Sequence, residues 1–356
     1  MSMWQVFAPG KLVLCGEYAV LLPGGEGLVL AVSSGILGRW EEVAGGAPLY
    51  SIETDLLPGR VSSLRYTPEG FHVEHSGAEQ VLSFVLTALT RVWTAGAHTG
   101  PPPGFRLCLK AEGALEVMTE AGPAKLGLGS SAAAVTATVK LALSGWKLPK
   151  RADDGLKLAF EAHAEAQGGR GSGVDVAASF LGGLVHVQQT ACGLQACRVA
   201  EPLPVSWLAV WTGQSAKTVP RVAQFHRWRT QAPAEAQRWV ESSTAETQRV
   251  LWALNKGDGD EVMAALHAHR QLLRKLGEFT GIEQETSALE KMAEVGAIFG
   301  VGKQSGAGGG DCGIILYRDE RQRSELENLL HAAQLIPLDL TQQNGVQGAL
   351  LPAGSV

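Results

Sequence analysis

Residues 127–132 have the composition of a phosphate-binding turn. Gly127, Gly129, Ser130 and Ser131 stand immediately before a run of strong helix formers, SAAAVTATVKLAL. A glycine-rich turn that opens a helix presents free backbone N–H groups and the positive end of the helix, and both bind phosphate oxygens. The same residues also suit a turn whose glycines satisfy tight packing. Taken alone, the segment leaves both interpretations open.

Asp175 and Lys11 are charged residues of the types that assist phosphoryl transfer. Asp175 follows a glycine-rich stretch, GGRGSG at 168–173, and Lys11 stands between Gly10 and the strand-like LVLCGE. Alone, the aspartate would usually cap a turn and the lysine would be a solvated charge at a strand edge. Phosphoryl transfer needs a held triphosphate, a positioned acceptor and positive charge where negative charge develops. These residue types can supply each requirement.

Two common ways of binding ATP are missing from the sequence. It contains neither a GxxxxGK[ST] segment nor a GxGxxG loop with a following strand lysine and HRD or DFG segments. The P-loop and protein-kinase arrangements therefore do not apply. If the turn at 127–132 binds a nucleotide, it does so within another architecture.

The composition describes a folded chain large enough for two domains. There are 356 residues, of which 45% are hydrophobic and 18% charged, and the net charge is −5. Domains usually contain about 100–200 residues. The net charge is negative, so we expect no nucleic-acid partner. No segment has the length and apolarity of a signal peptide or a membrane span, so we expect no membrane partner and a cytoplasmic location. Five scattered cysteines favour reduced thiols over a disulfide framework or a metal clip.

Several segments have the patterns of the elements that must position these residues. The helix near residue 269 has one apolar stripe of 3.6-residue period, and His269 on that stripe is more typical of packing than of catalysis. We expect three helices between the strand at 207–211 and the next strands. The expected strands are 4–14, 28–38, 105–109, 207–211, the IILY run after the loop SGAGGGDCG, and the tail 336–347, and the other expected helices are 131–143 and 154–167.

Three separated motifs resemble, in the right order, those of the GHMP kinases, named for galactokinase, homoserine kinase, mevalonate kinase and phosphomevalonate kinase. They are APGKLVLCGEYAVL at 8–21, KLGLGSSAAA at 125–134 and SGAGGGDCGIIL at 305–316. Within that superfamily the chain looks most like the phosphomevalonate kinases, because Tyr18 stands where mevalonate kinases typically have a histidine. The segments AHAEAQGGRGSGVDVAASFLGG at 162–183 and HRQLLRKLGEFTGIEQETSALEKM at 269–292 are also similar to that family.

The resemblance implies an α+β fold of two domains. Residues 1–200 would form a domain of the ribosomal S5 domain 2 type, with the ATP site and the catalytic aspartate. Residues 201–356 would form a ferredoxin-like domain with the third motif. The implied activity is ATP-dependent phosphorylation of 5-phosphomevalonate by a monomer or homodimer. Mevalonate kinase, diphosphomevalonate decarboxylase, another GHMP kinase and a silent metabolite sensor are the alternatives, and the presence of Lys11, Ser131 and Asp175 argues against the sensor.

The resemblance also implies roles for individual residues. Asp175 and Lys11 would be catalytic. ATP would be bound by Lys125, Gly127, Leu128, Gly129, Ser130, Ser131 and Ala132. The acceptor substrate would be bound by Lys11, Tyr18, Arg170, Ser172, Lys217, Ser305, Gly306, Ala307, Gly308 and Gly309.

A Mg²⁺ ion would accompany the ATP, because phosphate oxygens and a serine hydroxyl are the hard ligands that it prefers. Ser131 is the expected protein ligand. Mevalonate kinases use a glutamate before the catalytic aspartate for the second ligand, and aligning the segments with one gap puts His163 there. Glu161 and Glu165 are the nearby acidic candidates, and all three could equally be an ordinary polar helix face.

The chain departs from the family pattern at two places near the expected acceptor site. Gly169 followed by Arg170 replaces the usual lysine after AQG, and Lys217 in GQSAKT replaces a serine. We expect Arg170 and Lys217 to hold the acceptor's phosphate, because an acidic protein needs a local basic cluster for an anionic substrate. Solvated surface charges are the alternative, in which case residues such as Lys125 or Arg221 would hold the anion.

Overall fold

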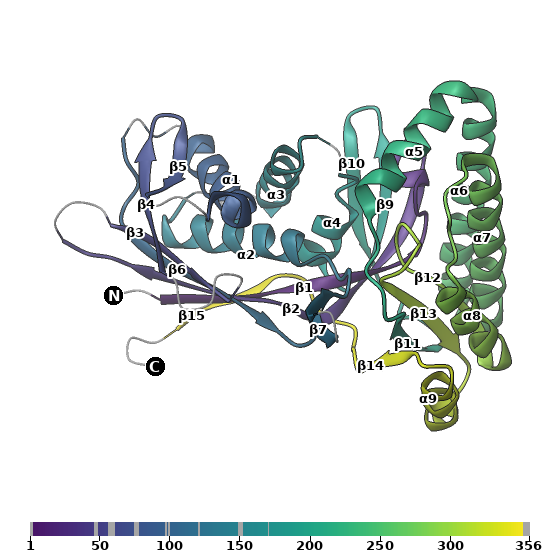
Figure 1. Ribbon diagram of the computed structural model, residues 1–356. Coiled ribbons are helices and arrows are strands. Elements are labelled where there is room, and N and C mark those ends of the chain that lie inside the picture. Colours follow the sequence, from purple (N-terminus) through teal and green to yellow (C-terminus); the bar gives the residue numbers. More distant parts are fainter. Residues whose placement is uncertain are drawn as a thin grey trace.

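The structure, a computed structural model, describes residues 3–45, 49–55, 61–74, 78–96, 98, 100–119, 122–148, 152–169 and 171–351. They form two β-sheets of unequal size, a short hairpin, and helices packed beside the sheets (Figure 1). The strands are β1 (Met3–Cys15), β2 (Glu26–Glu42), β3 (Tyr50–Thr54), β4 (Val61–Thr67), β5 (Gly70–Val73), β6 (Phe105–Glu112), β7 (Glu116–Thr119), β8 (Gly122–Lys125), β9 (Leu184–Thr190), β10 (Gly193–Val199), β11 (Ser206–Trp211), β12 (Gly300–Gln304), β13 (Cys312–Tyr317), β14 (Ile336–Leu338) and β15 (Gln347–Leu351). The helices are α1 (Glu79–Ala95), α2 (Ser130–Gly145), α3 (Ala152–Ala166), α4 (Val174–Leu181), α5 (Thr218–Gln231), α6 (Pro233–Lys256), α7 (Gly259–Thr280), α8 (Ser287–Phe299) and α9 (Arg323–Ala332), with 3₁₀ turns η1 (Ala19–Leu21) and η2 (Glu320–Gln322).

The nine-stranded sheet is organised around the long strand β2. One edge of β2 pairs with β1, and its other edge pairs with β9 near its start and with β6 near its end. Helices α1 to α4 lie on one face of this sheet (Figure 1). Helix α2 packs directly on β1 and β2, and alanines and other small residues make up most of its buried surface. Small side chains let the helix backbone approach the sheet closely, which brings the start of α2 next to β1.

The four-stranded sheet has the order β12-β13-β11-β14 and is antiparallel throughout. Helices α6, α7 and α8 stand together at this end of the molecule (Figure 1). The apolar stripe expected near residue 269 forms the buried face of α7, and His269 is fully buried in it. The prediction that His269 is a packing residue is confirmed.

Most expected elements are present, with two differences. The strands and helices expected from the sequence correspond to β1, β2, β6, β11, β13, α2, α3 and α7. Four helices, α5 to α8, lie between β11 and β12 in the described chain, whereas three were expected. Helix α5 has little apolar periodicity in its sequence, because only Phe225 and Trp228 are buried among its described residues.

The expected strand in the tail is divided between the two sheets. Strand β14 pairs with β11, and the chain then crosses back so that β15 pairs antiparallel with β1, from Met3 opposite Leu351 to Phe7 opposite Gln347. The change from the large to the small sheet falls between Val199 and Ser206, near the expected boundary at 200, but the last strand belongs to the large sheet. All five cysteines are free. No helix among the described residues is both long and apolar enough to cross a membrane.

Candidate active site

The turn at Gly129 joins the first and second motifs. Gly129 has a left-handed φ of 82° and is the N-cap of α2, whose first turn contains Ser130 and Ser131. No described side chain caps this helix, so its first N–H groups remain available to an anion. The backbone N–H of Lys11 donates to the carbonyl oxygen of Leu128 at 2.9 Å, which fastens the turn to β1.

Lys11 and Asp175 lie against this turn. A Cβ atom placed on Gly129 would be 3.3 Å from Cγ of Lys11 and 3.4 Å from Cβ of Asp175. The stems of both charged side chains therefore contact the same glycine. Lys11 Nζ donates to the carbonyl oxygen of Gly127 at 2.7 Å. Asp175 lies in the first turn of α4, and 21% of its side chain is exposed, which leaves the carboxylate accessible to a ligand.

A buried histidine connects Ser131 with Asp175. His163 Nε2 lies 3.2 Å from Ser131 Oγ and 3.8 Å from the nearer carboxylate oxygen of Asp175. The imidazole comes from α3, is 1% exposed and packs against the ring of Phe84 with centroids 5.2 Å apart. This packing holds the imidazole nitrogen of His163 between the hydroxyl of Ser131 and the carboxylate of Asp175.

The third motif contacts the end of β1. The Tyr18 hydroxyl donates to the carbonyl oxygen of Ala307 at 2.7 Å, and Ser305 Oγ accepts the backbone N–H of Val13 at 2.7 Å. Tyr18 has a φ of 62°, which is uncommon for a residue other than glycine. Burial raises the pKa of Tyr18 to about 12, so the side chain stays a neutral phenol and a hydrogen-bond donor near neutral pH.

The glycine loop of the third motif is itself held by specific contacts. Gly306, Gly308 and Gly309 all have positive φ values, between 72° and 98°. The N–H of Gly309 donates to the backbone oxygen of Gln284 at 3.1 Å, so this amide is occupied within the protein. The resemblance assigns this loop to the acceptor substrate, and the Gly309 amide is not free to bind it.

Asp311 is a site residue that the sequence analysis did not single out. Its Oδ1 accepts the N–H of Ala216 at 2.8 Å, and a Cβ on Gly127 would be 2.5 Å from its Oδ2. Burial raises the pKa of this carboxyl group above its usual value. Asp311 thus joins the third motif to the turn at 127–132 and to the segment that contains Lys217. The sequence shows Asp311 within GGGDCG, but no local pattern indicates that it contacts Ala216 and Gly127.

Comparisons with known proteins show the family of this chain. Residues 84–183 match the family model for the GHMP kinases N terminal domain. The phosphomevalonate kinase of Streptomyces sp. (strain CL190) is 31% identical over 364 aligned residues, which cover 94% of this chain and 96% of that protein. The chain belongs to the GHMP kinase family. The expected family is therefore confirmed over nearly the whole length of the sequence.

Solved structures show the same fold for this GHMP kinase. A Lin0012 protein from Listeria innocua superposes with a TM-score of 0.86 at 24% identity, covering 98% of this chain and 99% of that one. The phosphomevalonate kinase of Streptococcus pneumoniae, in complex with phosphomevalonate and AMPPNP, gives a TM-score of 0.75 at 23% identity, covering 96% and 100%. The expected GHMP kinase fold is confirmed.

The two glutamates expected near the metal pair with basic side chains in this GHMP kinase. Glu165 Oε2 lies 2.5 Å from Arg91 Nε, and Glu161 lies 3.9 Å from the same guanidinium and 4.0 Å from Lys157 Nζ. Both carboxylates are on the face of α3 that pairs with basic side chains. His163, on the other face, is the residue of the three that meets Ser131.

The remaining residues expected at the site differ in their exposure. Leu128 and Ala132 are buried, so only their backbone can meet a nucleotide, while the side chain of Lys125 is exposed. Lys217 is exposed at the N-cap of α5, and Ser172 is partly buried in the turn before α4. Arg170 lies outside the described residues.

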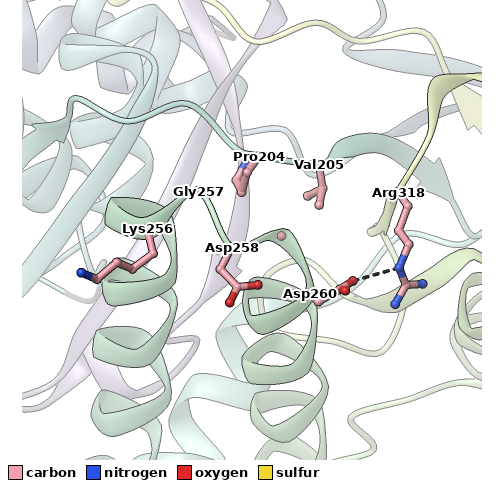
Figure 2. Close-up of a pocket in the computed structure, with 8 residues that line it drawn as sticks. Pro204, Val205, Lys256, Gly257, Asp258, Asp260 and Arg318 are labelled. Atoms are coloured by element: carbon pink, nitrogen blue, oxygen red, sulfur yellow. Dashed lines mark hydrogen bonds and ion pairs between the residues drawn. The ribbon is translucent and has the colours of Figure 1, made fainter.

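A separate surface pocket lies away from the three motifs. Its volume is about 470 Å³, and it occupies the turn between α6 and α7 (Figure 2). An ion pair between Arg318 and Asp260 at 2.8 Å crosses one side of it. The residues that line it are Pro204, Val205, Lys256, Gly257, Asp258, Gly259, Asp260 and Arg318, and none belongs to a motif. Its mixed charges do not reproduce the constellation around Gly129.

Proposed function

We propose that this GHMP kinase transfers the γ-phosphoryl group of ATP to 5-phosphomevalonate and releases 5-diphosphomevalonate and ADP. The full-length similarity to a phosphomevalonate kinase supports the choice of acceptor. The contact of Lys11 and Asp175 with one glycine at the uncapped start of α2 carries the argument for the chemistry. That geometry combines a phosphate-binding helix end, a cation and a proton acceptor at one point.

The balance of the reaction assigns a task to each group. An oxygen of the acceptor's phosphate forms a bond to the γ-phosphorus, and the bond from the γ-phosphorus to the bridging oxygen of ADP breaks. Any proton on the attacking phosphate passes to Asp175, which also orients that phosphate. Lys11 Nζ, held at the turn by the carbonyl oxygen of Gly127, supports the negative charge on the transferring group.

The oxygen donors at this turn fit a magnesium ion. Ser131 Oγ and an Asp175 carboxylate oxygen lie 3.2 and 3.8 Å from the same His163 nitrogen, so they face one region. Among the described residues no group of three or more His, Cys, Asp and Glu side chains could hold a metal. One or two protein oxygens plus phosphates and waters is the usual magnesium arrangement in kinases, and the ion neutralises charge on the β- and γ-phosphates when bound. We assign Ser131 as the protein ligand and Asp175 as the neighbouring carboxylate.

The acceptor is tested directly by a coupled ADP-release assay with a panel of acids. The panel contains mevalonate, 5-phosphomevalonate and 5-diphosphomevalonate, each with ATP and Mg²⁺, and the product is identified by mass. We expect ADP release and a mass gain of one phosphoryl group with 5-phosphomevalonate. Faster turnover of mevalonate would assign the chain to mevalonate kinases, and carbon dioxide release from the diphosphate would assign it to the decarboxylases.

A further inference from the structure

A buried ionic cluster lies where the first motif contacts the strand that leads into the third motif. Lys303 on β12 is 0% exposed, and Glu17 in the turn after β1 is 3% exposed. Lys303 Nζ lies 2.5 Å from Glu17 Oε1 and also donates to the carbonyl oxygen of Gln304 at 2.6 Å. The pair joins two segments that are 286 residues apart in the sequence.

His269 completes this cluster from helix α7. Its Nε2 accepts the backbone N–H of Gly16 at 3.0 Å and lies 3.1 Å from Ser243 Oγ. Because an accepting nitrogen carries no proton, the proton of the neutral imidazole is on Nδ1. Nδ1 faces Glu17 Oε2 at 3.6 Å, and neither atom has a hydrogen-bond partner among the described residues. Glu17 therefore lies between an ammonium group and an imidazole N–H.

The cluster is continuous with the contacts that hold the glycine loop 305–310. Tyr18, next to Glu17, donates to Ala307, and Ser305, two residues after Lys303, accepts from Val13. Glu17 is therefore next to Tyr18, and Lys303 is two residues from Ser305, and both neighbours form hydrogen bonds between the first motif and the loop.

A second chain of contacts reaches the far end of the same loop. Gln304, whose carbonyl oxygen accepts from Lys303, donates through its amide to Gln284 Oε1 at 2.8 Å. The backbone oxygen of Gln284 in turn accepts the N–H of Gly309 at 3.1 Å. The loop is consequently held at both ends by groups connected to one buried ammonium.

A buried ion pair contributes little net stability, because removing two charges from water offsets most of their mutual attraction. Its best-attested effect is to fix one arrangement of the segments that it joins. We propose that the Glu17–Lys303 pair, supported by His269, is a positioning device that sets the glycine loop 305–310 against β1 before substrate binds. This inference rests on the proposed function where it takes Tyr18 and the loop to be the acceptor side of the site.

The experiment removes both charges together in the full-length protein. The double variant Glu17→Gln/Lys303→Met keeps similar volumes and leaves no unpaired charge, so we expect it to fold. Amide hydrogen exchange of the unliganded protein should become about tenfold or more faster in residues 304–312 and stay unchanged in α2. The KM for 5-phosphomevalonate should rise about tenfold or more, while the KM for ATP stays within about threefold.

Matched variants separate positioning from general destabilisation. Lys303→Met alone leaves a buried carboxylate unpaired and should lower the melting temperature more than the double variant does. The exposed ion pair of Asp260 with Arg318 is the control, and Asp260→Asn/Arg318→Met should leave the exchange of residues 304–312 and both KM values unchanged. Should the double variant not fold, Glu17→Gln alone is measured by the same exchange criterion.

The two readouts also separate this inference from the proposed function. Wild-type exchange rates in residues 304–312 of the folded double variant would overturn the positioning role. Faster exchange with an unchanged acceptor KM would overturn the link to the acceptor side. If the wild-type protein does not phosphorylate 5-phosphomevalonate, the proposed function fails, and the exchange measurement still decides whether the pair positions the loop.

Discussion

Asp175 is the residue on which the proposed chemistry depends most directly. We expect Asp175→Asn to bind ATP normally and to lose turnover by roughly 10²- to 10⁴-fold, because the amide cannot accept a proton from the acceptor. Equilibrium nucleotide binding and steady-state kcat are the measurements. A variant with near wild-type kcat would remove Asp175 from the mechanism.

Ser131 has a role that can be distinguished from that of Asp175. Its hydroxyl lies at the first turn of α2, next to the His163 nitrogen. Ser131→Ala should raise the magnesium concentration needed for half-maximal activity and weaken MgATP binding more than acceptor binding, since the lost oxygen belongs to the metal's ligands. Titration of MgADP binding by calorimetry gives the same information without turnover. If only the acceptor KM changed, Ser131 would belong to the acceptor side.

His269 makes stability depend on pH. Burial and the nearby Lys303 ammonium hold its pKa well below 6.5 in the folded protein. The unfolded chain therefore binds the proton first as the pH falls, and stability decreases below about pH 6.5 by about 1.4 kcal/mol per pH unit while the folded imidazole remains neutral. We expect His269→Gln to show a smaller loss of stability than wild type between about pH 6.5 and 5.5.

Denaturant melts at the two pH values measure this difference. His267, exposed on the same helix, provides the matched control, and His267→Gln should keep the wild-type dependence. An equal pH dependence in His269→Gln and wild type would show that other groups cause the acid sensitivity. The groups that face His269 in the fold are Glu17 and Lys303, together with the hydroxyl of Ser243.

At the scale of elements, the segment 213–217 before α5 connects the second motif with the third. The Ser215 hydroxyl donates to the carbonyl oxygen of Lys125 at 3.0 Å, and Ala216 donates to Asp311. Lys217 then follows as the exposed N-cap of the helix. Lys217 thus directly follows a residue whose backbone is bound to the third motif.

We expect Lys217→Ala to raise the KM for 5-phosphomevalonate by roughly tenfold or more and to leave the KM for ATP within a few-fold, because one charged hydrogen bond contributes about 1.5–3 kcal/mol. Lys256→Ala, which removes an exposed lysine from the pocket of Figure 2, is the control. Arg170→Ala is expected to act as Lys217→Ala does. If both variants keep the wild-type KM for every acidic acceptor, other residues such as Arg221 hold the anion.

The sequence predicted elements and motifs well but not the contacts between them. Lys11, Ser131 and Asp175 each stand beside a local signal, namely a strand, a helix start or a glycine turn. Asp311 and Lys303 have no such signal, because their partners are far away in the chain and leave no periodicity near them. For Glu161 and Glu165 the helix was predictable from the sequence, but their pairing with the distant Arg91 was not.

At the scale of the whole molecule, the C-terminal segment ties the two sheets together. Backbone hydrogen bonds connect Ser33 to Thr341, Gln343 to Ala31, Gly183 to Gln343 and Val346 to Ser179, and β15 then pairs with β1. Ending the chain after Leu340 should lower the free energy of unfolding by more than about 2–6 kcal/mol, because these four bonds are each worth about 0.5–1.5 kcal/mol and the pairing of β15 with β1 is lost with them.

Denaturant unfolding of the truncated protein measures this loss. A chain that ends after Leu351 removes only residues beyond β15 and is the control. Unchanged stability after truncation at Leu340 would show that the returning segment adds nothing to the large sheet. Deletion of β15 also leaves an edge of β1 unpaired, so we expect more association between molecules at high concentration.

The pairing of β1 with β15 also sets an order of events during synthesis. Residues 3–7 of β1 are synthesised long before residues 347–351 of β15, so the pairing between them cannot form until β15 has been made. Until then the emerging chain carries an open edge of β1 at residues 3–7, in the same strand as Lys11. Contacts of the nascent chain with chaperones should therefore concentrate on β1, and release from them should coincide with the synthesis of β15.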